Sequence, residues 1–459
     1  DKKWKCEVCN FNNSSFDDIC QRSKKNDEIC GCPKPENEGY EGAIVLHPKP
    51  GIYDDAPISV LDYASLYPSS MISENISHDT IVLDSKYDNL PGYEYVDITY
   101  DLFKGKGDDK KKIGEQTCRF AQFPNGEKGL LPRILQKLLK QRKSTRKKIT
   151  WKTISLKSGD TYKGNIVGDD DNIIKLKVED KDTKEINKDD IDSKVDTYNE
   201  FQKAVLDGLQ LAYKVTANSL YGFVGAPTSQ LFMKELAAST TATGRNLIMS
   251  AKKFAEEEYN CEVVYGDTDS IFIKLPPLSC YEKFGHKTEE KNILQYNVTV
   301  GEELSDGFQK LLKPPHCLEW EKMFYPFIIF SKKRYVGNLY EHDVYKFKQK
   351  SMGIVLKRRD NANIVKIIYG GIINKILNGE GVKKSLEFLH NSLEKLSNGE
   401  YPLEELIVTK TLRGFYKNPQ QIAHKVLADR MKKRDPGSAP QSNDRVPYVY
   451  IQTKEDKNK

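Results

Sequence analysis

Residues 262–275 read EVVYGDTDSIFIKL, with two aspartates, Asp267 and Asp269, between two apolar runs. The pattern predicts a strand, a tight turn and a second strand, with both acids at the tip of the hairpin. Carboxylates beside apolar strands are costly unless they are paired or bind a metal. Because the stretch contains neither histidine nor cysteine, the pair favours a hard cation held by oxygen, such as Mg²⁺. A solvated turn is the alternative for a lone pair of this kind.

A third acid also follows an apolar strand. Ile58, Val60 and Leu61 read as a strand that runs into Asp62. Two strands that deliver acids to one edge of a sheet would form a two-metal site. Metal ions about 3.5–4 Å apart clamp the attacking and leaving oxygens of an in-line displacement. The acids therefore point to phosphoryl transfer.

Two predicted helices flank a segment of different character. The pattern is helical from Leu130 and again over about 201–221. Between them, residues 151–198 alternate apolar and polar side chains, with turn signals at 158–160 and 168–170. We therefore expect a helical hairpin that carries a small antiparallel β barrel, of the Sm or SH3 type, at its tip.

Both helices present cations at helical spacing. Arg142 and Arg146 lie four residues apart in the first helix, and Lys214, Asn218 and Tyr221 share one face of the second. If these cations face inward, the hairpin would clamp a triphosphate.

The composition indicates a folded chain that meets a polyanion. Of 459 residues, 38% are hydrophobic, and the net charge is +6. Basic clusters lie at 133–152, 331–335 and 357–361. Clusters of this kind suit nucleic acid, although solvated helix faces are the alternative. Because no apolar run is long enough to span a bilayer, we expect no membrane partner.

Three motifs, DYASLYPS (62–69), KVTANSLYG (214–222) and YGDTDS (265–270), resemble in this order the polymerase motifs of family B DNA polymerases. The delta-like branch, found in eukaryotes and large DNA viruses, is the most similar. Further landmarks match at YEGA (40–43), SKKRY (331–335), GIVLKRRDN (353–361) and RDPGSAPQSNDRVPYV (434–449). The resemblance covers residues 40–459 apart from the insert.

The resemblance implies an α+β right-hand polymerase fold. The palm would have an antiparallel sheet, the fingers a helical hairpin, and the thumb a mainly helical, incomplete structure. The expected domains are a zinc-finger-like segment (1–39), the palm (40–129 and 222–352), the fingers (130–221, with the insert at 151–198) and the thumb (353–459).

Site residues follow from the resemblance by position. Asp62 and Asp269 would be the principal ligands of two Mg²⁺ ions, with the backbone carbonyl of Tyr63 completing one shell. Asp267 would be either a further ligand or an electrostatic support, and Glu321 is a nearby acid. The nucleotide contacts would be the backbone amides near Ser65 and Leu66, the steric gate Tyr67, the cations Arg142, Arg146 and Lys214, and Asn218 and Tyr221 at the nascent base pair.

The DNA contacts are also implied by the resemblance. Lys332, Lys333, Arg334 and Tyr335 would hold the new duplex, and Lys357, Arg358 and Arg359 would grip the primer strand. Tyr40 and Gly42 would guide the template between the polymerase and exonuclease domains. Contacts of this kind position the duplex without reading its sequence.

The expected reaction is addition of a dNTP to a primer 3′ end with release of pyrophosphate, in DNA replication. The partners would be primer-template DNA, dNTPs and a sliding clamp or accessory subunits, in a nucleus or at a viral replication site. The alternative is a non-catalytic nucleic-acid-binding fragment of a larger polymerase. The chain begins at Asp1, and no exonuclease motifs precede Tyr40. We therefore expect a fragment that lacks the proofreading exonuclease.

Five cysteines crowd the N-terminus. Cys6, Cys9 and Cys20 follow Trp4 in a spacing that is similar to the Ran-binding-protein type of zinc finger. That family's fourth cysteine position holds Ser23 here. Cys32, or alternatively Cys30, would complete a site of four thiolates for Zn²⁺. A loose linker of reduced thiols is the other possibility.

Overall fold

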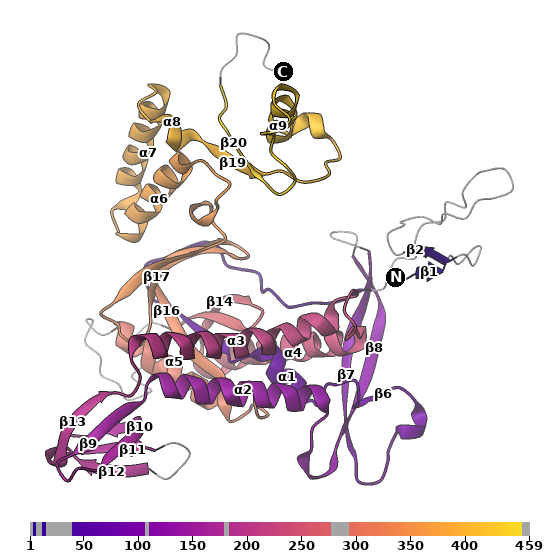
Figure 1. The fold of residues 1–459 in the computed structure, drawn as a ribbon, viewed down its shortest axis with the longest axis vertical. Coiled ribbons are helices and arrows are strands. Elements are labelled where there is room, and N and C mark those ends of the chain that lie inside the picture. Colours follow the sequence, from indigo (N-terminus) through magenta and orange to yellow (C-terminus); the bar gives the residue numbers. More distant parts are fainter. Residues whose placement is uncertain are drawn as a thin grey trace. The chain divides into compact units, whose positions relative to one another are not determined.

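The computed structural model describes residues 3–5, 12–14, 39–105, 110–178, 183–276 and 293–451 (Figure 1). The chain divides into two units. The first comprises Asp1–Ile44, Tyr63–Met249 and Leu311–Cys317, and the second comprises Val45–Asp62, Ser250–Lys310 and Leu318–Lys459. The predicted hairpin with its two aspartates belongs to the second unit.

A seven-stranded sheet organises the second unit. Its order is β14-β15-β5-β16-β17-β18, with β4 beside β16. The strands are β4 (Gly51–Tyr53), β5 (Ile58–Tyr63), β14 (Glu262–Asp267), β15 (Ser270–Lys274), β16 (Leu318–Ser331), β17 (Arg334–Tyr340) and β18 (Phe347–Met352). The hairpin and the strand before Asp62 are therefore confirmed, and they are neighbours in one antiparallel array. Helix α5 (Ile293–Gln309) packs on β16.

The core of this sheet is aromatic. Phe272, Phe324 and Phe327 pack together beneath Val60 and Val264, all of them almost fully buried. Rings 272 and 324 are stacked, with centroids 6.2 Å apart. Because β-branched and aromatic residues fill both neighbouring strands, burial fixes their register and thereby the position of the acids at the strand ends.

The first unit combines a second sheet with long helices. The sheet has the order β3-β7-β8-β6. Its strands are β3 (Gly39–Tyr40), β6 (Ile81–Val82), β7 (Glu94–Lys104) and β8 (Lys111–Gln122), with the 3₁₀ turns η1 (Ser85–Tyr87) and η3 (Pro124–Gly126). The helices are α1 (Leu66–Ser73), α2 (Leu130–Ile149) and α3 (Glu200–Gly225), together with the first part of α4 (Lys234–Tyr259).

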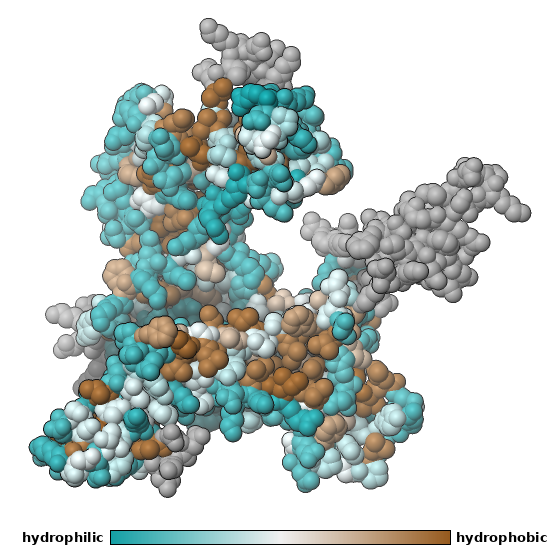
Figure 2. Space-filling model, in the orientation of Figure 1, coloured by the Kyte–Doolittle hydropathy of each residue, from teal (hydrophilic) through white to brown (hydrophobic). Residues whose placement is uncertain are grey.

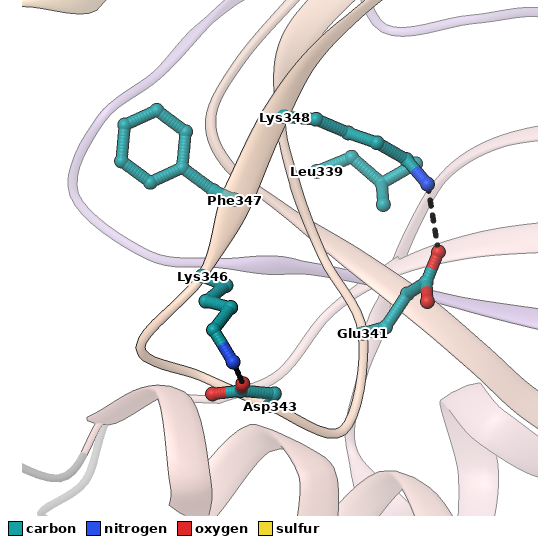
Figure 3. Close-up of a pocket in the computed structure, with 6 residues that line it drawn as sticks. All are labelled: Leu339, Glu341, Asp343, Lys346, Phe347 and Lys348. Atoms are coloured by element: carbon teal, nitrogen blue, oxygen red, sulfur yellow. Dashed lines mark hydrogen bonds and ion pairs between the residues drawn. The ribbon is translucent and has the colours of Figure 1, made fainter.

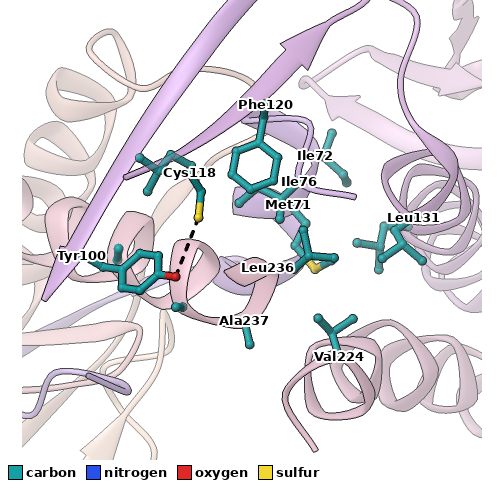
Figure 4. Packing of buried hydrophobic residues seen from close by; sticks show 14 of the residues in the cluster. Met71, Ile72, Ile76, Tyr100, Cys118, Phe120, Leu131, Val224, Leu236 and Ala237 are labelled. Carbon is teal, nitrogen blue, oxygen red and sulfur yellow. Dashed lines mark hydrogen bonds between the residues drawn. The ribbon is translucent and has the colours of Figure 1, made fainter. Parts of the chain in front are cut away.

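One apolar cluster joins these elements (Figure 4). Met71 of α1, Phe120 of β8, Leu131 of α2 and Leu236 of α4 are buried in it. Helix α2 buries Leu131 and Leu135, whereas Ile134 remains 42% exposed. Helix α3 runs beside α2 and extends to Gly225, beyond the predicted end. The α2–α3 pair therefore forms the expected helical hairpin.

Helix α3 keeps apolar side chains in solvent. Phe201, Val205, Leu211, Val215 and Phe223 are all exposed. Figure 2 shows hydrophobic areas over the region of the α2–α3 hairpin.

The insert forms a five-stranded antiparallel sheet in the order β12-β11-β10-β9-β13. Its strands are β9 (Lys152–Leu156), β10 (Thr161–Asp169), β11 (Ile173–Lys177), β12 (Thr183–Asn187) and β13 (Ile191–Asp196), with the 3₁₀ turn η4 (Lys188–Asp190). Ile154, Ile174, Leu176 and Ile186 form its own small core.

Strand β10 changes partner half-way along. Residues 161–164 pair with β9, and residues 165–169 pair with β11. A Cβ on Gly164 would lie 2.1 Å from the carbonyl oxygen of Lys177, so the bend requires glycine. Within the described residues β12 and β13 do not pair, so closure into a barrel is not confirmed.

The C-terminal part of the second unit is mainly helical, as predicted. It contains η7 (Val355–Lys357), α6 (Asn363–Leu377), α7 (Gly381–Ser397), α8 (Leu403–Leu406), β19 (Val408–Thr411), η8 (Pro419–Gln421), α9 (Ala423–Arg434) and β20 (Arg445–Tyr448). At the other end of the chain, β1 (Lys3–Lys5) pairs with β2 (Asn12–Ser14). The N-terminal cysteines predicted to bind zinc lie outside the described residues.

Candidate active site

Three aspartates gather at one end of neighbouring strands in the second unit. Asp62 of β5 pairs directly with Ser270 of β15, and Ser270 pairs on its other side with Asp267, the last residue of β14. Asp269 immediately precedes Ser270 in the turn, where Thr268 has a φ of 60°. Directly paired residues have Cα atoms about 4.5–5.5 Å apart, so the sheet brings the three predicted acids together.

Asp269 lies in an environment that disfavours negative charge. Burial raises the pKa of its carboxyl group, and the nearby carboxylates Asp267 and Glu321 raise it further. Glu321 itself is bound by Lys322. Asp269 makes no ion pair with any residue in the described ranges. A carboxylate held in this way has a strong electrostatic preference for a cation.

Asp267 is already neutralised by a lysine. Lys333 Nζ lies 2.6 Å and 2.8 Å from its two carboxylate oxygens. The Tyr265 hydroxyl donates to Asp267 at 3.1 Å and accepts from the Lys333 backbone N–H at 2.9 Å. The two aspartates of the hairpin therefore have different electrostatic roles in the structure.

The SKKRY segment forms the turn between β16 and β17. Lys332 Nζ donates to the Val45 carbonyl at 2.9 Å, and Lys333 takes a positive φ of 62°. Arg334 is exposed. The Tyr335 ring packs against Phe272, Phe324 and other rings of the core, and burial raises its pKa to about 12. Of these four predicted DNA contacts, two are held in the protein by their ammonium groups and one by its ring.

In the first unit, Tyr67 lies in a pair of aromatic rings. Its centroid is 4.5 Å from that of Tyr221 on α3. On α4, Gly244 approaches the Tyr67 ring so closely that a Cβ there would lie 3.1 Å from Cε1 of Tyr67. A glycine in a helix often marks such a close approach. The structure therefore brings Tyr67 and Tyr221, two predicted nucleotide contacts, into contact with each other.

The residues around Tyr67 are arranged as a helix start. Ser65 adopts left-handed φ and ψ of 55° each at the N-cap of α1, and the first helical residue, Leu66, is buried. Amides at a helix N-terminus favour anions. Burial raises the pKa of the Tyr63 hydroxyl, which donates to the Leu247 carbonyl at 2.9 Å.

The predicted triphosphate cations lie on the α2–α3 hairpin. Arg142 Nε donates to Gln210 Oε1 on α3 at 3.4 Å. Arg146, Lys214 and Asn218 are exposed. Their side chains are therefore available to solvent, and only Arg142 bridges the two helices.

The YEGA segment is bound by α4. Arg245 donates to the carbonyl oxygens of Glu41 and Gly42, and Thr241 Oγ1 donates to that of Glu41 at 2.9 Å. The Tyr40 hydroxyl lies near Gly225, since a Cβ there would come within 3.3 Å of it. Thr241 and Arg245 were not predicted as functional residues. Their spacing of four residues in a helix was the available signal.

The third basic cluster surrounds an aspartate. Arg358 binds Asp360 through two nitrogens, at 3.0 Å and 2.9 Å, and Lys410 Nζ lies 2.9 Å from the same carboxylate. These contacts hold the pKa of Asp360 far below its usual range. Lys357 ends η7, Arg359 is exposed, and the Arg359 carbonyl accepts from Arg445 at 2.9 Å.

The described ranges contain neither a preformed metal-binding cluster nor a candidate membrane span. No group of three or more His, Cys, Asp or Glu side chains has metal-binding geometry in those ranges. None of their helices has the length and apolar character needed to cross a bilayer.

Comparison with known families decides the relationship. The sequence model of DNA polymerase family B matches residues 14–161 and 184–459. The chain belongs to DNA polymerase family B. Residues 162–183, which this model leaves unmatched, lie inside the insert, so the middle of the insert departs from the common family B sequence.

Relatives in this family include viral and cellular enzymes. The chain is 64% identical over 417 residues to the DNA polymerase of Pyramimonas orientalis virus, covering 91% of this chain and 34% of that protein. It is 32% identical over 439 residues to the DNA polymerase delta catalytic subunit of Candida albicans, covering 92% of this chain and 34% of that protein. The chain thus spans about a third of the length of these curated relatives.

A solved structure supports the fold. The family B DNA polymerase from the archaeon Pyrobaculum calidifontis superposes with a TM-score of 0.53 at 22% identity, covering 93% of this chain and 43% of that one. The mixed α/β architecture with an antiparallel sheet is therefore that of family B, as predicted.

Proposed function

We propose that this chain is the catalytic core of a template-directed DNA polymerase, which adds dNTPs to a primer 3′ end and releases pyrophosphate. One observation carries the proposal. Asp62 of β5 pairs with Ser270 of β15, and Asp269 is the turn residue immediately before Ser270. Both acids lie within motifs that match the family in order. The relatives named above are DNA polymerases, which supports the same activity here.

Asp62, Asp269 and the carbonyl of Tyr63 would hold two Mg²⁺ ions. The donor set is hard oxygen, and the burial and neighbouring carboxylates that raise the pKa of Asp269 suit a divalent cation. Mg²⁺ in such sites commonly keeps waters and substrate phosphates beside one or two carboxylates. When bound, the ions would stabilise the charge that develops on the transferred phosphoryl group.

Asp267 has a supporting role in this proposal. Its charge is already compensated by Lys333 at 2.6 Å, so it has less to offer a metal than Asp269 has. We assign the Asp267–Lys333 pair to positioning the hairpin turn. Lys333 thereby links the SKKRY turn, which is a proposed duplex contact, to the β14–β15 turn that carries Asp267 and Asp269.

The first unit would bind the nucleotide. Tyr67 would exclude the ribose 2′-hydroxyl, with its ring in contact with Tyr221 and close to Gly244. The amides at the start of α1, near Ser65 and Leu66, would meet the β- and γ-phosphates. The remaining nucleotide contacts are proposed to be Arg142, Arg146, Lys214 and Asn218.

DNA contacts would come from several segments. The exposed Arg334 of the SKKRY turn would meet duplex phosphates, and residues 357–359 would meet the primer strand. Tyr40 and Gly42, held by α4, would guide the template. Palm (40–129 and 222–352), fingers (130–221) and thumb (353–459) are proposed on this basis, and a sliding clamp or accessory subunits are proposed partners.

Primer extension with Mg²⁺ tests the proposal. Asp269→Asn and Asp62→Asn should each lower single-nucleotide addition by about a thousandfold or more, while primer-template binding persists. Asp55→Asn is the matched control, because Asp55 is an exposed acid of the same unit that binds Lys274. Binding of primer-template by the wild-type chain without any extension would favour the alternative, a non-catalytic nucleic-acid-binding fragment.

A further inference from the structure

A cavity of about 280 Å³ lies in the first unit, lined by α1, α2, the segment before α2, and a proline pair. Its walls are Ile72, Leu139, Pro314 and Pro315, with Gln136 and Lys128 as the polar groups. An apolar cavity of about 150 Å³ can take up benzene. This cavity therefore has room for a fused pair of aromatic rings.

Lys128 gives the cavity a positive charge. Its side chain is half-buried, and burial lowers its pKa, as does the nearby Lys313. The one nearby acid, Glu74, is already engaged, because Lys313 Nζ and Ser73 Oγ each lie 2.9 Å from its carboxylate. Lys128 has no ion pair within the described ranges. Because burial has removed part of its hydration, this ammonium group would be stabilised by an anion bound beside it.

In a second cavity, by contrast, the charges of the lysines are balanced by carboxylates. It measures about 240 Å³ and lies in the second unit at the β17–β18 hairpin (Figure 3). Both of its lysines are paired, Lys346 with Asp343 at 2.8 Å and Lys348 with Glu341 at 3.1 Å. That cavity has no uncompensated lysine to attract a ligand, which is the property that distinguishes the Lys128 cavity.

We propose that the Lys128 cavity binds a small organic monoanion with a flat apolar body, such as an aromatic carboxylate. The carboxylate would pair with the Lys128 ammonium group, and Gln136 would supply a further polar contact. The ring would lie against Ile72, Leu139 and the two prolines. Such a ligand would contact α1 and α2 together. The proposal does not depend on polymerase activity.

Calorimetric titration of the full chain with 2-naphthoate tests it, with naphthalene-2-carboxamide as the uncharged probe of the same shape. The wild type should bind the carboxylate about tenfold more tightly than the amide, the usual order of a charged hydrogen bond. Lys128→Met should remove this preference, and Lys128→Arg should keep it. Lys137→Met is the matched control, because Lys137 is an exposed lysine of α2 that does not line the cavity.

A second variant separates the cavity from its charge. Gln136 is an exposed residue of α2 that lines the cavity. The Gln136→Trp side chain should fill the cavity and weaken the binding of both probes, while the thermal unfolding temperature of the protein stays unchanged. The proposal is overturned if the wild type binds neither probe, or if it does not distinguish them. Equal binding of 2-naphthoate by the wild type and Lys128→Met would overturn it too.

Discussion

Gly244→Ala should stabilise α4 and at the same time displace the ring of Tyr67. Gly244 lies inside a helix with an ordinary negative φ, so alanine should stabilise that helix by about 1 kcal/mol. The new methyl group, however, would lie 3.1 Å from Tyr67 Cε1 and 3.3 Å from Leu66 Cδ2. Tyr67 must therefore move by a few tenths of an ångström. If a displacement of 1 Å costs about a hundredfold in rate, a shift of this size should cost about fourfold in kcat/KM for dNTPs.

Gly208→Ala is the control, because Gly208 lies inside α3 and a Cβ there would meet nothing within 4 Å. Both variants should resist denaturant at least as well as the wild type. Steady-state extension with dNTPs and with rNTPs should then change in Gly244→Ala alone, with the ratio of the two kcat/KM values altered as the gate shifts. Identical kinetics for the two stable variants would refute the assignment of Tyr67 as the gate.

Four further results are expected. Tyr67→Ala should raise rNTP incorporation relative to dNTP by at least about tenfold, because the ring excludes the 2′-hydroxyl, and an unchanged ratio would place the gate elsewhere. Lys333→Met should slow single-nucleotide addition by about 10- to 100-fold, less than Asp269→Asn, because it acts only through Asp267; equal losses would contradict that order. Replacing residues 153–195 by a short linker should leave single-nucleotide addition intact, and loss of chemistry in a folded variant would show that the insert takes part. Elemental analysis should find one zinc ion per molecule in the wild type and none in Cys9→Ser, and primer extension by the two proteins should be equal. Less than half an equivalent of zinc in the wild type would contradict the zinc-finger prediction.

Local patterns were sufficient for the elements that carry the acids. The apolar residues that run into Asp62, and the apolar runs on both sides of Asp267 and Asp269, predict strands that the structure contains. The partners of these acids were not predictable in the same way. Lys333 meets Asp267 from 66 residues away, and Arg245 meets the Glu41 carbonyl from 204 residues away. Such pairs depend on sheet order and helix placement, which the periodicity of a single segment does not contain.

A sequence motif also does not show which of its side chains are buried in the protein core. Tyr335 belongs to the SKKRY motif, yet its ring is part of the aromatic core, because it follows the turn on the side of β17 that faces Phe272. Closure of the insert is a similar case. Alternation predicts strands, whereas the pairing of β12 with β13 depends on how far the sheet curls.

The insert leaves and re-enters the helical hairpin at a single point. Lys152 and Asp196 are paired residues on β9 and β13, the Thr197 N–H donates to the Trp151 carbonyl at 3.0 Å, and Asp196 also binds Lys203 on α3. A segment whose two ends meet side by side can be exchanged for any other segment with the same property. This position is therefore suited to the insertion of another domain. A circularly permuted fluorescent protein inserted there would interrupt neither helix, and its fluorescence would respond to movements of the hairpin.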